Sequence, residues 1–193
     1  ESGVQKNLNA IRKGITLEDT RRAVRAAKGV GLTVSTPFIF GLPGETFQEG
    51  LRTIEFAVEL DPDLANFHAL TPFPGTDLFD RRARYGTVSG DFRDFTYQGA
   101  AFVPHTMTRT EIHALRQIAF KRFYARPSFL LKKLLALRTL HDLRAAVRGA
   151  RSLLWLWAGR SAFERRRAAA SAGGPAGQAE VLLDQSRVPP RVE

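Results

Sequence analysis

The sequence predicts an α/β fold, because two apolar, strand-like segments alternate with two helix-like segments along the first part of the chain. A helical pattern over residues 16–28 precedes an apolar run at 31–40, and a second helical pattern over 46–60 precedes a shorter apolar run at 64–71. The connections between these segments are short. Alternation of this kind is typical of right-handed crossovers that place the strands side by side in a parallel sheet.

The predicted helices begin at threonines that can cap them. Thr16 precedes the first helix, and T-x-x-E capping boxes occur at Thr46 with Glu49 and at Thr108 with Glu111. In such a box the threonine hydroxyl accepts from a helical N–H, and the glutamate accepts from the N–H of the threonine. The box at Thr108 predicts a further helix, whose buried face comprises Ile112, Leu115, Ala119 and Phe123.

The first predicted strand, residues 31–40, is rich in Val, Thr, Ile and Phe and nearly free of charge. This pattern is typical of a strand in a parallel sheet that is buried on both faces. Pro37 interrupts it, and a proline has no N–H to donate to a neighbouring strand. We therefore expect a bulge or a sheet edge at Pro37.

Composition limits the classes of protein to which the chain can belong. Its 193 residues with 44% hydrophobic content predict one globular domain with a tail. The absence of cysteine excludes disulfides, thiolate metal sites, a cysteine nucleophile and an iron–sulfur cluster held by this segment alone. No apolar run has the length of a membrane span, and no signal-like segment precedes the first helix. Since the first residue is Glu1 and not Met, we expect a piece of a longer polypeptide. We expect that polypeptide in the cytoplasm, either free or at the surface of a membrane.

The segment with the clearest chemical meaning is the glycine-containing turn that follows the first strand, Gly41-Leu42-Pro43-Gly44-Glu45-Thr46. Glycines at the carboxyl end of a parallel strand allow a ligand to approach the backbone, and the next helix can offer free N–H donors. The alternative is a strand-to-helix turn without a ligand. Local chemistry alone leaves both interpretations open.

Three short motifs occur in order along the chain. They are Glu1-Ser2-Gly3, the turn at 41–46, and Thr71-Pro72-Phe73-Pro74-Gly75-Thr76. Together they resemble the radical S-adenosylmethionine superfamily over about residues 1–79. The resemblance is closest to the branch with a cobalamin-binding N-terminal domain, which the stretch Phe123-Tyr124-Ala125-Arg126-Pro127 also resembles.

This resemblance implies that residues 1–84 are the C-terminal part of a partial (β/α)6 barrel. A mostly helical extension over 85–158 and a disordered tail over 159–193 would follow. S-adenosylmethionine would lie across the carboxyl ends of the strands, beside a 4Fe-4S cluster. By similarity, the cofactor-binding residues would be Glu1, Ser2, Ile39, Gly41, Leu42, Pro43, Gly44, Glu45, Thr71 and Pro72.

The resemblance also implies that this chain is one part of a longer enzyme and that another part holds the cluster. The CxxxCxxC loop that would hold the 4Fe-4S cluster is missing, so the cluster and any cobalamin would depend on an N-terminal part. The complete protein would cleave S-adenosylmethionine reductively, for methylation, cyclisation or rearrangement of a small-molecule or lipid-like substrate. The chain alone is expected to be inactive.

Two side chains of the second strand are candidates for contact with a substrate. Asn66 and His68 alternate with Phe67 and Ala69, so both project from one face of the strand. If that face is the barrel interior, they reach the substrate. The alternative for His68 is a hydrogen-bonded core residue.

The C-terminal part of the chain is basic and rich in leucine, in keeping with a formal charge of +10. Arginines and lysines alternate with leucines and with Trp155 and Trp157 over about residues 126–160. We expect a helical cap on the barrel, held by Leu130, Leu131, Leu134, Leu135 and Leu137. The alternative is a non-catalytic basic module that binds an anionic membrane surface or nucleic acid. Aromatic residues among the leucines favour the membrane over nucleic acid.

Overall fold

A computed structural model describes residues 1–96 and 99–135 of the chain. The chain divides into two compact units, Glu1–Lys132 and Lys133–Glu193, and the first holds nearly all of the described residues. The part of the expected helical extension over residues 136–158, which includes Leu137, and the disordered tail expected over 159–193 lie outside the described residues.

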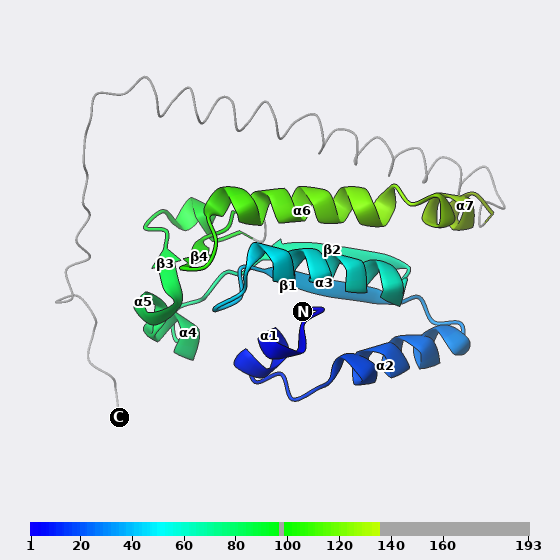
Figure 1. Ribbon diagram of the computed structural model, residues 1–193, viewed down its shortest axis with the longest axis horizontal. Coiled ribbons are helices and arrows are strands. Elements are labelled where there is room, and N and C mark those ends of the chain that lie inside the picture. The colour runs from blue at the N-terminus through cyan, green and yellow to red at the C-terminus, as the bar shows by residue number, and fades with distance from the viewer. Residues whose placement is uncertain (97–98, 136–193) are drawn as a thin grey trace, which may run out of the picture. The chain divides into compact units, whose positions relative to one another are not determined.

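The described elements follow one another in a mixed α/β order (Figure 1). They are α1 (Gln5–Ala10), α2 (Leu17–Gly29), β1 (Ser35–Phe40), α3 (Phe47–Leu60), β2 (Leu64–Ala69), α4 (Asp77–Asp80), α5 (Arg82–Tyr85), β3 (Gly86–Val88), the 3-10 helix η1 (Phe92–Asp94), β4 (Phe102–Pro104), α6 (Arg109–Tyr124) and α7 (Pro127–Leu135). The predicted alternation is confirmed by α2, β1, α3 and β2. The sequence pattern did not predict α1, nor the antiparallel pair of β3 and β4.

All three predicted helix starts are confirmed. The hydroxyls of Thr16, Thr46 and Thr108 each accept a hydrogen bond from a helical N–H three residues on. Each helix also completes a capping box, with Asp19 in α2 and the predicted Glu49 and Glu111 in α3 and α6. The local sequence therefore sets these boundaries.

Strands β1 and β2 are adjacent and parallel, as predicted. Their register runs without a bulge and pairs Pro37 with Asn66 and Ile39 with His68. The N–H of Ile39 points away from β2 and donates to the carbonyl of Glu1 over 2.8 Å. Because residues two apart point the same way, the missing N–H of Pro37 faces this same edge. Of the two expectations for Pro37, a bulge is wrong and a sheet edge is confirmed.

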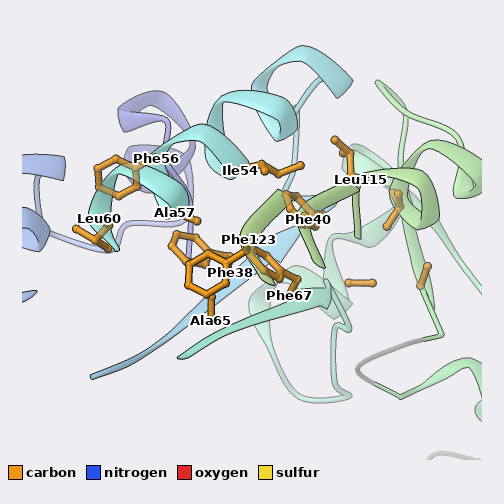
Figure 2. Close-up of a cluster of buried hydrophobic side chains, with 14 of the residues drawn as sticks. Phe38, Phe40, Ile54, Phe56, Ala57, Leu60, Ala65, Phe67, Leu115 and Phe123 are labelled. Carbon is orange, nitrogen blue, oxygen red and sulfur yellow. The ribbon is translucent and has the colours of Figure 1, made fainter. Parts of the chain in front are cut away.

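One face of this sheet is packed against α3 and α6. Phe38 and Phe40 of β1 stack on Phe67 of β2, with ring centroids 5.6 and 6.0 Å apart. Phe123 of α6 meets Phe67 edge-on, and Figure 2 shows these rings gathered in one cluster with Leu115 and Ile54. The other face carries Ser35, Pro37, Ile39, Leu64, Asn66 and His68, which are exposed or half-buried. Burial of β1 on both faces, as its composition predicted, is wrong for the described chain.

The expectation that leucines of the C-terminal helices are buried is also wrong within α7. Leu130, Leu131, Leu134 and Leu135 are between 55% and 74% exposed. Phe129 is the buried residue, in ring contact with Phe123 and Tyr124. Since the leucines lie on the opposite side of the helix from Phe129, docking of that ring turns them outward.

Candidate functional site

The turns that follow β1 and β2 lie at the same end of the sheet, where both strands finish. The N–H of Leu70 donates to the carbonyl of Phe40 over 2.9 Å, so Gly41 and Thr71, each just beyond its strand, lie at the same end of the sheet. Pro72 is buried, and the Thr71 hydroxyl donates to the carbonyl of Thr96 over 3.4 Å. The second and third motifs of the sequence are thus brought together by the parallel pairing.

The first motif reaches this region from the other side of β1. Glu1 extends the hydrogen bonding of the sheet through its carbonyl, which accepts from Ile39. One carboxylate oxygen of Glu1, Oε1, accepts from Lys13 Nζ at 2.8 Å. The other, Oε2, is buried and makes no hydrogen bond with the described residues. This oxygen is therefore a free acceptor close to the carboxyl end of β1.

Glu45 lies inside the turn and is fully buried. Its Oε2 accepts from the N–H of Gly41 at 2.7 Å and from that of Leu42 at 3.1 Å. Burial raises the pKa of Glu45 to about 7, and the two backbone donors oppose that rise. The carboxylate therefore holds the backbone of the turn and is not presented to a ligand.

A buried polar network connects the turn to the first motif. The Ser2 hydroxyl lies 3.2 Å from Thr53 Oγ1, which also accepts from the N–H of Gly3 at 3.1 Å. Asn7 Nδ2 lies 3.4 Å from both Ser2 Oγ and Glu45 Oε1. Gly3 is needed for this contact, because a Cβ there would lie 2.8 Å from the Cα of Thr53. Ser2, Asn7, Glu45 and Thr53 thus join α1, α3 and the turn.

Several N–H groups of the turn and of the start of α3, where the sequence led us to expect free donors, are used within the protein. Glu45 accepts from Gly41 and Leu42, and the N–H of Glu45 itself donates to the carbonyl of Leu42. The N–H groups of Thr46 and Glu49 are used in the capping box. These five N–H groups are therefore not free to bind a ligand.

Position 41 requires a glycine for two reasons, its backbone conformation and the closeness of a neighbouring side chain. Its φ is +86°, in the left-handed region, and an added Cβ would lie 3.2 Å from Ile112 Cδ1 of α6. This position faces the protein core. Gly44 also has a positive φ, of +73°, but a Cβ there would meet open space. Pro43 is half-buried between them, and Leu42 is buried.

The candidate substrate residues lie on the sheet face opposite the one that packs against α3 and α6. Asn66 Nδ2 donates to Ser35 Oγ at 3.2 Å. His68 is half-buried beside Ile39, and burial, followed by the charge of Arg116, lowers its pKa below the ordinary value. A neutral imidazole and an amide therefore lie on the same face as Ile39.

The described residues do not provide a metal-binding group. Within 1–96 and 99–135, His, Asp and Glu form no group of three that could hold a metal ion. A 4Fe-4S cluster needs thiolates, and the sequence has no cysteine, so the residues present do not fit that group. None of the helices in the described part is both long and apolar enough to cross a bilayer.

Two residues of the network, Asn7 and Thr53, were missed by sequence reasoning. Asn7 lies on α1, a short helix that the sequence pattern did not predict, and Thr53 lies on the apolar face of α3. A polar residue within the apolar stripe of a helix was the available signal, because such a residue needs a buried partner.

The chain is similar to segments of larger proteins. It is 37% identical over 133 residues to an uncharacterized methyltransferase of Pyrococcus horikoshii, a match that covers 68% of this chain and 29% of that protein. It is 30% identical over 130 residues to the anaerobic magnesium-protoporphyrin IX monomethyl ester cyclase of Rubrivivax gelatinosus, covering 67% of this chain and 23% of the cyclase. It is 32% identical over 136 residues to the cytidylyl-2-hydroxyethylphosphonate methyltransferase of Streptomyces wedmorensis, covering 65% and 26%.

The chain therefore spans less than a third of the length of each of these relatives. No protein-family model matches it. Two of the relatives are named as methyltransferases and one as a cyclase, so the similarity is to a segment shared by enzymes whose names give different reactions.

Proposed function

We propose that this chain is the later part of a cobalamin-type radical S-adenosylmethionine enzyme and that it supplies part of the surface that binds S-adenosylmethionine. One observation carries the proposal. Three segments far apart in sequence, Glu1–Ser2, residues 39–45 and Thr71–Pro72, meet at the carboxyl ends of two parallel strands. In open parallel sheets, ligands bind at the carboxyl ends of the strands.

The chemistry of these segments suits a nucleoside attached to an amino acid. The carboxylate of Glu1, whose side chain is 23% exposed, can accept a hydrogen bond from a ribose hydroxyl or an ammonium group. Ile39 and the exposed backbone at Gly44 offer apolar and peptide surface for the adenine ring. When bound with a cluster held elsewhere in the polypeptide, S-adenosylmethionine would supply a 5′-deoxyadenosyl radical.

The contribution of this chain to the reaction would be to bind and orient. Asn66 and His68 lie on the same sheet face as Ile39, so a substrate placed next to the adenosyl group would reach them. His68 would act there as a neutral hydrogen-bonding group, because its pKa is lowered. The relatives' names include methyl transfer and ring closure, and either reaction needs a substrate held in a fixed position.

Binding of S-adenosylhomocysteine, an analogue that is not consumed, tests the proposal in the complete polypeptide that contains this chain. We expect Glu1→Gln to weaken binding about tenfold in calorimetry, since one charge-assisted hydrogen bond is lost. Lys13→Met is the matched control, because it removes the partner of Glu1 Oε1 and leaves the carboxylate. Equal losses in both variants, or no binding by the wild type, would contradict the proposal.

A second function is favoured by the exposed leucines of α7. We propose that Leu130, Leu131, Leu134 and Leu135 contact an anionic bilayer surface. Phe129 and the ion pair between Lys132 and Asp61 fix the opposite side of the helix, which leaves the leucine side outward. The sequence after α7 is rich in Arg, a composition that suits anionic headgroups.

Co-sedimentation with vesicles tests this second function. The chain should bind vesicles that contain phosphatidylserine better than pure phosphatidylcholine vesicles. Leu130→Gln with Leu134→Gln should reduce binding, whereas Leu32→Gln, at a leucine that is 61% exposed far from α7 in sequence, should not. Preferential binding to duplex DNA, lost in the same double variant, would assign the surface to nucleic acid instead.

A further inference from the structure

Asn7 is a fully buried polar residue that the proposed binding function does not use directly. It lies on α1, between the first motif and the turn after β1. Its Nδ2 is 3.4 Å from Ser2 Oγ on one side and 3.4 Å from Glu45 Oε1 on the other. Asn7 is therefore the one described side chain with hydrogen bonds to both of these cofactor-binding candidates.

We propose that Asn7 is a positioning residue, which holds the Glu1–Ser2 segment and the 41–45 turn in the fixed relation that cofactor binding requires. This inference rests on the proposed function, because it assumes that both segments meet one ligand. Ser2 is tied to α3 through Thr53, and Glu45 is tied to the turn through Gly41 and Leu42. Asn7 connects these two sets of bonds.

The second amide atom of Asn7 gives this position a further property. Asn7 Oδ1 is buried and makes no hydrogen bond with the described residues. The amide can therefore serve either protonation state of Glu45. Nδ2 donates to the carboxylate, and after rotation of the amide Oδ1 can accept the proton of the neutral acid. A leucine of similar shape could do neither.

Three neighbouring groups, on α1, on α3 and at Thr106, surround Glu45. From α1, Lys6 lies near the turn, with Nζ 3.4 Å from the carbonyl of Gly44, and it lowers the pKa of Glu45. From α3, Glu49 raises that pKa, and it pairs with Lys6 at 2.6 Å. The Thr106 hydroxyl donates to the backbone carbonyl of Glu45 and leaves the carboxylate untouched. Burial is the largest influence, so loss of one donor should shift the equilibrium further toward the neutral acid.

The test compares Asn7→Leu with wild type in the complete polypeptide, by two measurements. The first is the unfolding free energy as a function of pH, which reports the titration of Glu45 by comparison with Glu45→Gln. The second is the affinity for S-adenosylhomocysteine at pH values on both sides of 7. Asn9→Leu is the matched control, because Asn9 lies on the same helix but is exposed, and its side chain bonds only Gln5 among the described residues.

We expect Asn7→Leu to move the titration of Glu45 upward and to weaken binding about tenfold where Glu45 is ionised, the value of one hydrogen bond to a charged group. The loss should be smaller where Glu45 is protonated, because a hydrogen bond between the amide and the neutral acid is weaker than one to the carboxylate. Asn9→Leu should leave both measurements unchanged. A merely structural role would weaken binding equally at every pH and leave the titration in place, and that result would overturn the proposal.

The test also decides the case in which Asn7→Leu does not fold and the case in which the wild type does not bind the analogue. If Asn7→Leu does not fold, Asn7→Asp can be studied at acidic pH, where both carboxyls are protonated, and its stability should then fall more steeply than that of wild type as pH rises. An unchanged slope would overturn the proposal. If the wild type does not bind S-adenosylhomocysteine, the proposed function fails, whereas the titration shift alone still decides whether Asn7 positions Glu45.

Discussion

The hydroxyl of Tyr124 bonds both backbone groups of Ala65: it accepts from the N–H over 3.1 Å and donates to the carbonyl over 2.7 Å. Ala65 lies on the edge of β2 that faces away from β1. Next along this edge, the Nε of Arg116 donates to the carbonyl of Phe67 over 3.2 Å. Two side chains of α6 thus satisfy backbone groups that another strand would otherwise pair, and an exposed sheet edge is avoided.

Removal of the Tyr124 hydroxyl should expose this edge. We expect Tyr124→Phe to lower the unfolding free energy by about 1–3 kcal/mol, because two buried backbone groups lose their partner. Denaturant unfolding measures the loss, and amide exchange at Ala65 should become faster. Tyr85→Phe is the control, since no hydrogen bond of its hydroxyl is found in the described chain, and it should change little. Equal stability of both variants would show that the Tyr124 bonds are dispensable.

The two glycines of the turn should differ in their tolerance of a side chain. Gly41→Ala and Gly44→Ala both place alanine at a positive φ, which costs about 1 kcal/mol each. Gly41→Ala should cost more, because its Cβ would lie 3.2 Å from Ile112 Cδ1. Ile112→Val removes that atom, so we expect the double variant to be more stable than the sum of the single changes predicts. Strict additivity in the unfolding free energies would contradict the contact.

The pH dependence of stability should carry a contribution from Glu45. Its pKa is raised from 4.5 to about 7, so the folded state holds the proton more tightly than the unfolded chain does. The associated stabilisation is complete below pH 4.5 and is lost as the pH rises to about 7, a change of about 3 kcal/mol. Glu45→Gln should remove this decline.

Other titrating groups act differently, which is why the comparison with Glu45→Gln is needed. The lowered pKa values of Asp19, Glu49, Glu59, Asp61 and Glu111 give stability that is lost only as the pH falls through the acidic range. His68 has a lowered pKa, so its protonation at acidic pH opposes the effect of Glu45. Identical pH profiles for wild type and Glu45→Gln would contradict the assigned burial.

The chain by itself should hold no iron–sulfur cluster. Residues 1–193 contain no cysteine, so iron and sulfide added under reducing conditions should not bind stoichiometrically. S-adenosylmethionine should remain intact, as measured by the absence of 5′-deoxyadenosine in chromatography. Production of 5′-deoxyadenosine by the purified chain would contradict this prediction. The complete polypeptide under the same conditions is the positive control.

Helix starts and strand order could be predicted from the sequence because both depend on neighbouring residues. The cap at Thr46 needs only Glu49 three residues away, and the parallel pairing of β1 with β2 follows from the helix between them. The positions of Gly41 and Thr71 at one end of the sheet follow from the same local rules. The cofactor-binding role of these residues stays a prediction.

Tertiary structure decided which polar groups are paired and which apolar groups are covered. The sequence does not show that Glu45 turns back on its own turn. Its burial depends on Asn7, 38 residues away in the chain, and on Ser2 and Thr53, which are themselves 51 residues apart. Nor could the leucine pattern of α7 tell which side of the helix docks, since Phe129 is held by rings of α6. Local hydrogen bonds and periodicity thus determined the elements, whereas partners distant in sequence determined the site, because desolvation depends on everything that packs around a group.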